Sequence, residues 1–233
     1  ENFYRGDYEG RLTNEVALEA KHICYGPMED VSLKLHKGEI LGIGGLTDCG
    51  MHDLGKVLFG AIRPDYGEVT VGGGTRITTT GQAVKSHMGY ISKNRDTEAL
   101  MSAGSVKDNI CLPNLPRLQK GGLVPPKKEM ELAETWGKTL SIKMQSPKQY
   151  CMYLSGGNKQ KVSIAKWLAS EAEIYIFDCP TRGIDIGVKA DIYRLLSDLK
   201  KQGKAILMIS EELPELIGMS DRILTFKNGA ISG

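Results

Sequence analysis

One segment, residues 40–60, constrains the fold of this chain more than any other. It reads ILGIGGLTDCGMHDLGKVLFG, in which a short apolar run leads into a loop with glycines at Gly45 and Gly50. An apolar run without polar interruption is typical of a parallel strand covered on both faces. Apolar residues at helical spacing follow the loop and predict a helix; these are Met51, Leu54, Val57 and Leu58. The segment therefore predicts a strand, a glycine loop and a helix within an α/β fold.

The glycine spacing matches the frame of a phosphate-binding loop, G-x-x-x-x-G-K-[ST], which here runs from Gly45 to His52. Two positions depart, because Met51 and His52 stand where lysine and a hydroxyl residue are expected. Such a lysine contributes a charge-assisted hydrogen bond of about 1.5–3 kcal/mol to phosphate. Asp48 adds an anion, and two unit charges about 4 Å apart repel by about 4 kcal/mol at an effective dielectric constant of 20. We therefore expect phosphate binding to be weakened by several orders of magnitude.

The rest of the pattern predicts an α/β P-loop core with a mainly parallel sheet, an antiparallel β subdomain and a helical lobe. Residues 1–15 are polar and aperiodic and are interpreted as a linker or tail. From residue 16, alternation of apolar and polar residues predicts strands joined by a turn at Gly26-Pro27. The proline-rich stretch at about 96–155 is interpreted as the helical lobe. Further expected elements are helices at 126–140, 157–170 and 188–201, strands at 173–178 and 205–210, and a hairpin at Asn228-Gly229.

Composition excludes several classes of protein. The net charge is +2, which gives no electrostatic reason to expect nucleic acid or an anionic membrane surface as a partner. No apolar run approaches the roughly 20 residues that span a bilayer. The five cysteines are scattered and show no C-x-x-C spacing, so buried reduced thiols are favoured over a disulfide framework or a zinc site.

The string LSGGNKQKV starts a second motif at Leu154. Ser155, Gly156 and Gly157 stand directly before a periodic helix, and a hydroxyl with backbone N–H groups at the positive end of a helix can bind an anion. Three such residues alone are also compatible with an ordinary helix start. The longer string, including Gln160, resembles the signature motif of ATP-binding-cassette (ABC) ATPase subunits from bacterial sugar importers.

A third motif, IYIFDCPTRGIDIG, places Asp178 after an apolar strand. A carboxylate at that point is typical of a Walker B strand, whose aspartate holds Mg²⁺ through water. The following residues resemble the D-loop of the same importers, in which the aspartate, here Asp185, lies across a dimer interface. The resemblance places Cys179 where the family has its catalytic glutamate, and a neutral thiol cannot act as that base.

Two further segments resemble the family and depart from it at single positions. Lys93 stands at the Q-loop position that usually holds Gln or Glu, and Glu211 stands where a hydrolysing site has the switch histidine. Tyr25 or His22 is a candidate for the aromatic residue that stacks on adenine, and a core or turn role for either stays open.

The resemblance covers residues 16–233 and is to the second, C-terminal nucleotide-binding domain of ribose- or galactose-type import ATPases. It implies ATP and Mg²⁺ as cofactors, held mainly in the partner domain's site. The implied partners are an N-terminal nucleotide-binding domain of the same subunit, membrane permease subunits and, indirectly, a sugar-binding protein. The implied location is peripheral, on the cytoplasmic face of the membrane. Because the chain begins at Glu1 rather than Met, we expect a fragment of a longer polypeptide.

Together these departures predict an asymmetric ATPase. In this hypothesis the chain's own site is impaired, and its signature completes the ATP site of the partner. Weak nucleotide binding through backbone N–H groups of the loop stays open. The alternative is a non-hydrolytic dimerisation or regulatory module that serves no transporter. An unrelated P-loop kinase or GTPase is disfavoured, because those enzymes lack LSGGNKQ.

Overall fold

A computed structural model describes residues 13–46 and 48–232. The chain divides into two compact units, which are described separately. The first comprises Glu1–Tyr90, Glu173–Thr181 and Ile186–Gly233, and the second comprises Ile91–Ala172 and Arg182–Asp185. Most of the tail expected at residues 1–15 lies outside the described residues. Of its described part, Thr13 donates its backbone N–H to the carbonyl of Lys37 at 3.2 Å.

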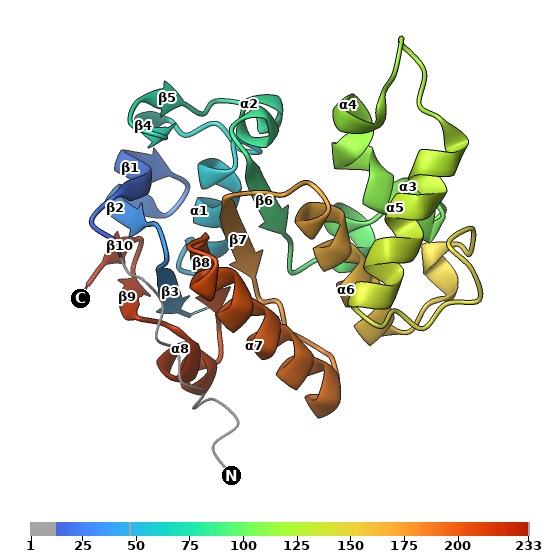
Figure 1. Cartoon of the computed structure of the whole chain (residues 1–233). Coiled ribbons are helices and arrows are strands. Elements are labelled where there is room, and N and C mark those ends of the chain that lie inside the picture. The colour runs from blue at the N-terminus through green and yellow to red at the C-terminus, as the bar shows by residue number, and fades with distance from the viewer. Residues whose placement is uncertain (1–12, 47, 233) are drawn as a thin grey trace. The chain divides into compact units, whose positions relative to one another are not determined.

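A six-stranded sheet forms the centre of the first unit, with the order β10-β9-β3-β8-β7-β6 (Figure 1). Strand β3 pairs in parallel with β8 and β9, and β7 pairs in parallel with β8. The three central strands are almost completely buried, as their continuous apolar runs predict. The mainly parallel sheet is therefore confirmed. Its strands are β3 (Ile40–Gly45), β6 (Met88–Ile91), β7 (Ile174–Asp178), β8 (Ala205–Ser210), β9 (Arg222–Lys227) and β10 (Ala230–Ile231).

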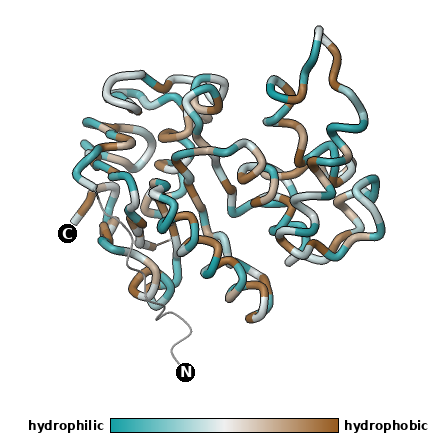
Figure 2. The backbone as a smooth tube through the Cα atoms, in the orientation of Figure 1, coloured by the Kyte–Doolittle hydropathy of each residue, from teal (hydrophilic) through white to brown (hydrophobic). Residues whose placement is uncertain are grey.

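Helices pack on this sheet. Helix α1 (Met51–Leu58) contacts β3, β7 and β8, α7 (Ile186–Lys201) contacts β8, and α8 (Leu213–Met219) contacts β3 and β8. Helix α8 packs closely on β3 because Gly44 has no side chain. A Cβ at this position would lie 2.7 Å from Leu216 Cδ1, which is too close. Figure 2 shows hydrophobic and hydrophilic stretches alternating along the turns of α7, as expected for a helix with one buried face.

The first unit also holds an antiparallel sheet with the order β2-β1-β4-β5. Strands β1 (Val16–Tyr25) and β2 (Met28–His36) form a hairpin, and β4 (Tyr66–Val71) pairs with β1 and with β5 (Thr75–Arg76). The short helix α2 (Thr80–Lys85) follows, capped by the side chain of Thr79. The predicted antiparallel β subdomain is confirmed.

The second unit is helical. Its core is formed by small and aliphatic side chains from α3, α5 and α6, including Val106, Ile110, Ala133 and Val162. The elements are η1 (Arg95–Ala99), α3 (Val106–Cys111), η2 (Leu112–Asn114), α4 (Leu115–Leu118), α5 (Pro126–Thr139), η3 (Cys151–Tyr153) and α6 (Gly156–Leu168). The unit extends beyond the expected lobe of 96–155, since the apolar face of α6 contributes to the same core. Within residues 13–46 and 48–232, no helix combines the length and the apolar character needed to cross a bilayer.

Lys166, on α6, carries a perturbed ammonium group. Burial lowers the pKa of Lys166 from 10.5 to about 8, because a charged ammonium loses hydration inside the unit. Its Nζ donates to the carbonyl of Ala99 at 2.8 Å and lies 5.2 Å from the ring centre of Trp167. The side chain therefore destabilises the folded chain while it is charged.

This pKa predicts an unusual dependence of stability on pH. Between about pH 8 and 10.5 the folded chain releases a proton that the unfolded chain retains, so the destabilisation present below pH 8 is lost as the pH rises. Relative to a Lys166→Met variant, the wild type should gain about 2–3 kcal/mol of unfolding free energy over this range. Urea unfolding at a series of pH values measures the difference. The same comparison with Lys161→Met is the control, and a pH-independent difference for Lys166→Met would contradict the assignment.

Candidate functional site

The glycine loop and the start of α1 define one side of the candidate site in the first unit. Gly50 precedes α1 with φ of 97°, a left-handed conformation that favours glycine. Met51 is fully buried, and Asp48 is exposed. Asp48 and Gly45 also line a cavity of about 830 Å³ that extends along the β9–β10 hairpin. The loop therefore presents a carboxylate, and no lysine, at the start of the helix.

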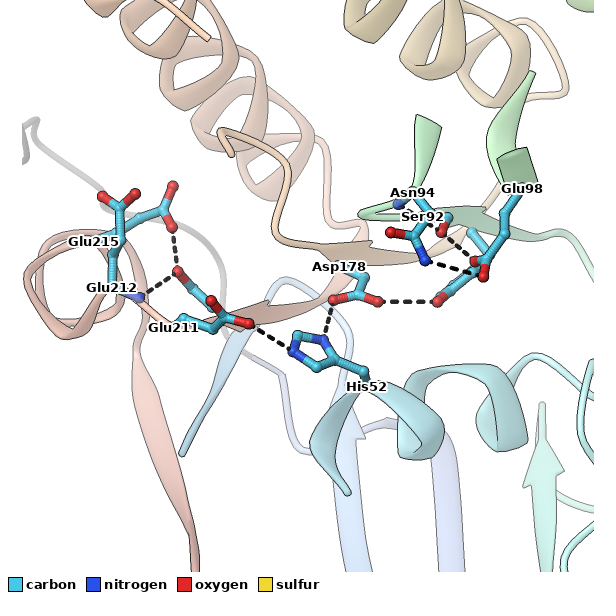
Figure 3. Close-up of polar contacts among 10 residues, drawn as sticks. His52, Ser92, Asn94, Glu98, Asp178, Glu211, Glu212 and Glu215 are labelled. Atoms are coloured by element: carbon cyan, nitrogen blue, oxygen red, sulfur yellow. Dashed lines mark hydrogen bonds and ion pairs between the residues drawn. The ribbon is translucent and has the colours of Figure 1, made fainter. Parts of the chain in front are cut away.

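His52 connects this helix to the ends of two strands (Figure 3). Its Nδ1 lies 2.6 Å from Asp178 Oδ1, and its Nε2 lies 3.1 Å from Glu211 Oε1. Tyr90 donates its hydroxyl to Asp178 Oδ2 at 3.1 Å. Asp178 is completely buried at the end of β7, and the His52 side chain is 9% exposed. His52 and Glu211, two positions that depart from the family pattern, therefore join the motif residue Asp178 in one hydrogen-bonded group.

Both carboxylate oxygens of Asp178 are engaged by this group, one by an imidazole and the other by a phenol. Cys179 follows directly, with φ of 47° and its backbone N–H bound to the carbonyl of Ile209 at 2.9 Å. One ligand atom each from His52, Cys179 and Glu211 lies within 4.8 Å of the others. The structure thus brings together four of the predicted site residues at the carboxyl ends of neighbouring parallel strands.

A buried glutamate that no sequence pattern singles out anchors the loops beside this group. Glu215 on α8 is 1% exposed. Its Oε1 accepts from Thr181 Oγ1 at 2.5 Å and from Tyr193 OH at 3.0 Å, and its Oε2 accepts from Ser210 Oγ at 2.5 Å. Thr181 lies after β7 and Ser210 ends β8, so one carboxylate fixes both strand ends.

The signature residues lie in the second unit, at the start of α6. Ser155 is exposed at the N-cap, and its side chain makes no capping hydrogen bond to the helix backbone. Instead, its Oγ accepts from Asn158 Nδ2 at 2.8 Å, while Asn158 Oδ1 accepts the backbone N–H of Lys143 at 2.8 Å. The first N–H groups of a helix lack partners within the helix. Ser155, Gly156 and Gly157 therefore offer an exposed hydroxyl beside the positive end of α6.

Two other features accompany the signature. Gln160 is 2% exposed, and its Nε2 makes no hydrogen bond with the residues that the structure describes. Arg95, which sequence reasoning did not select, donates to the carbonyls of Arg182 at 2.9 Å and Gly183 at 3.3 Å. Its guanidinium would lie 3.2 Å from a Cβ on Gly156. Arg95 thus holds the loop that contains Asp185 against the signature helix.

The remaining candidates lie in both units. In the second unit, Lys93 is half-buried and Asp185 is exposed. In the first unit, His22 lines a separate cavity of about 520 Å³, and its Nδ1 lies 2.6 Å from Asp30 Oδ1. Tyr25 is half-buried at the end of β1. Of these two residues, His22 lines this cavity and Tyr25 does not, and the role of either in stacking on adenine stays a prediction.

Comparison with known proteins decides the family. A family model described as ABC transporter matches residues 28–182. The chain belongs to the ABC transporter family. The match includes the glycine loop, the signature and the end of β7, and members of this family bind ATP, usually with Mg²⁺.

This ABC domain is similar to two curated relatives named ribose import ATP-binding protein RbsA. The protein from Bacillus subtilis (strain 168) is 44% identical over 209 residues, which are 89% of this chain and 42% of that protein. The protein from Clostridium perfringens (strain SM101 / Type A) is 41% identical over 229 residues, which are 97% of this chain and 46% of that protein. The chain thus spans less than half the length of these relatives.

Solved structures support the same fold. A dimeric ATP-binding cassette in a post-hydrolysis state, bound to ADP and Pi, superposes with a TM-score of 0.81 at 20% sequence identity. The match covers 93% of this ABC domain and 97% of the solved chain. A nucleotide-free ATP-binding cassette from an ABC transporter gives a TM-score of 0.77 at 22% identity. The ABC ATPase fold predicted from the motifs is therefore confirmed.

Proposed function

We propose that this chain is the second nucleotide-binding domain of a sugar import ATPase, and that it serves the catalytic site of a partner domain rather than its own. The names of the relatives favour import of ribose or a related sugar. Their greater length leaves room for an N-terminal nucleotide-binding domain in the same subunit. Permease subunits, and indirectly a sugar-binding protein, complete the proposed assembly at the cytoplasmic face of the membrane.

The observation that carries the proposal is the contact of His52 with Asp178 and Glu211. Mg²⁺ prefers oxygen ligands in near-ideal octahedral geometry, including the hydroxyl that follows the loop lysine in a working site. Here the imidazole of His52 stands at that position, and its Nδ1 lies 2.6 Å from Asp178 Oδ1, so this carboxylate is already engaged. The base position holds the thiol of Cys179, and the switch position holds a carboxylate. These residues do not fit Mg²⁺ with a triphosphate, so the chain's own site is proposed to be inactive in hydrolysis.

The signature residues, in contrast, do not depart from the family pattern. Ser155 is exposed, its hydroxyl is held by Asn158, and the two glycines that follow leave the backbone of α6 accessible. Such a helix start stabilises the charge of a phosphate through N–H groups and the helix dipole. In the proposed assembly, Ser155, Gly156 and Gly157 contact the γ-phosphate of ATP held by the partner domain. Gln160, which is 2% exposed, is proposed to help frame the same site.

Restoring only the missing lysine tests the impairment of the chain's own site. A Met51→Lys substitution in the assembled transporter should leave ATP turnover per assembly unchanged, because His52 still occupies Asp178 and no base replaces Cys179. Steady-state phosphate release measures turnover. Since Met51 is fully buried, an unfolding midpoint measured alongside establishes that the variant folds. Met51→Leu is the matched control, and a rise in turnover confined to the lysine variant would refute the proposal.

A further inference from the structure

We infer that His52, Cys179 and Glu211 form a binding site for a transition-metal cation of the Zn²⁺ class at the position where a working ABC domain holds Mg²⁺. The three side chains come from α1, from the residue after β7 and from the residue after β8. Their ligand atoms lie within 4.8 Å of one another. No two of these residues are closer than 32 positions in sequence, from Cys179 to Glu211, so the fold assembles the cluster.

The distances suit a tetrahedral ion. With bonds of about 2.0–2.2 Å, a tetrahedral Zn²⁺ holds its nitrogen and oxygen ligands about 3.3–3.5 Å apart. The distance from His52 Nε2 to Glu211 Oε1 is 3.1 Å. The Sγ of Cys179 belongs to the same cluster, whose three ligand atoms lie within 4.8 Å of one another, and a shift of about 1.3 Å or less brings it to the roughly 3.5 Å that a Zn–S bond of about 2.3 Å requires.

The orientation of the His52 ring also favours a metal site. Metal-binding histidines usually donate the N–H of the other ring nitrogen to a carboxylate, which fixes the tautomer and raises the basicity of the ligand. His52 Nδ1 lies 2.6 Å from the carboxylate of Asp178, which is itself held by the hydroxyl of Tyr90. His52 Nε2 faces a Glu211 oxygen at 3.1 Å, and both atoms can act as ligands to a cation bound beside them.

The donor set selects the class of metal. Thiolate and imidazole favour Zn²⁺ and its neighbours in the transition series, whereas Mg²⁺ and Ca²⁺ prefer oxygen ligands throughout. Three protein ligands leave the fourth tetrahedral position to water or to an exogenous ligand.

The backbone at Cys179 gives independent support. A non-glycine residue at φ of 47° is uncommon and costs about 1–3 kcal/mol, and such residues gather at functional sites. The N–H of Cys179 is bound to β8, which holds the residue in this conformation beside Glu211. Cys179 and Cys49 are both 7% exposed, yet only Cys179 belongs to the ligand cluster among the described residues. Cys49 therefore provides a matched control.

Titration with Co²⁺, a spectroscopic substitute for Zn²⁺, tests the inference on the purified, chelator-stripped protein. We expect a sulfur-to-cobalt charge-transfer band that saturates at one equivalent and is abolished by stoichiometric Zn²⁺ but not by excess Mg²⁺. Cys179→Ser should remove the band, and Glu211→Gln should weaken binding at least 10-fold. Asp178→Asn should weaken binding by about 10–100-fold while keeping the band. Cys49→Ser should bind as the wild type does.

The inference is overturned if the wild type shows no band, or if Cys179→Ser keeps both the band and the affinity. Circular dichroism checks that each variant folds. Glu211 is the most exposed of the three ligands, so Glu211→Gln remains informative if a buried substitution fails to fold. Because the readout is the absorption spectrum of bound Co²⁺, it is independent of ATP turnover, and failure here leaves the proposed function standing.

Discussion

Ser155→Arg should reduce ATP turnover of the assembled transporter by at least about 100-fold, the usual loss when a donor to developing charge is removed. The side chain of Ser155 is exposed at the start of α6 and carries the hydroxyl proposed to contact the partner's γ-phosphate. Arginine at this point removes the hydroxyl and fills the space beside the two glycines. Phosphate release by the purified assembly in lipid measures the effect.

Ser146→Arg is the matched control, since Ser146 is an exposed serine of the same unit that lies outside α6. It should retain turnover close to that of the wild type. Ser155→Ala separates the two causes of loss, because it removes the hydroxyl without adding bulk and should have an intermediate effect. Wild-type turnover in Ser155→Arg would show that this signature completes no active site.

Glu215→Leu should lower the free energy of unfolding by about 3–5 kcal/mol, because it leaves three buried hydroxyl donors without their acceptor. Thr181, Ser210 and Tyr193 all donate to this carboxylate at 2.5–3.0 Å. Their hydroxyls would remain buried beside an apolar side chain. Denaturant unfolding followed by circular dichroism gives the change in the midpoint.

Two further variants should be less destabilising than Glu215→Leu. Glu215→Gln keeps an oxygen for Thr181 and Tyr193 and should cost about 1–2 kcal/mol. Glu212→Ala, on an exposed residue that pairs with Lys189 at 3.1 Å, should cost at most about 1 kcal/mol. If Glu215→Leu were no more destabilising than Glu212→Ala, the carboxylate would not anchor the two strand ends.

Sequence patterns predicted the helices and strands best where the spacing of apolar residues matches the face that is buried in the fold. The apolar run before Gly45 predicted a buried parallel strand, and its pairing with β8 and β9 confirms this. The alternation from Val16 predicted the antiparallel strands, which are also present. Helix α5 begins at the expected Pro126 and ends at Thr139, one residue before the predicted end. These elements depend on periodicity and turn residues, which are properties of neighbouring positions.

Periodicity and motif spacing do not predict side-chain contacts between segments that are far apart in the sequence. His52, Asp178 and Glu211 were each identified as departures or motif residues, but nothing in their spacing indicated that His52 bonds both carboxylates. The hydrogen bonds of Arg95 and Glu215 were missed for the same reason. The residues next to a charged side chain do not indicate its partner when that partner is far away in the sequence. Arg182, whose carbonyl accepts from Arg95, is 87 residues away from it.

A structure of the assembled transporter with a non-hydrolysable ATP analogue and Mg²⁺ would show directly which domain holds the nucleotide. We expect a triphosphate bound by the partner domain and contacted by the Ser155 hydroxyl and the N–H groups of α6. We also expect His52 to remain in contact with Asp178, with no Mg²⁺ at that carboxylate. A triphosphate in this chain's own loop, with Mg²⁺ beside Asp178 and the start of α6 directed away from nucleotide, would refute the proposed division of roles between the two domains.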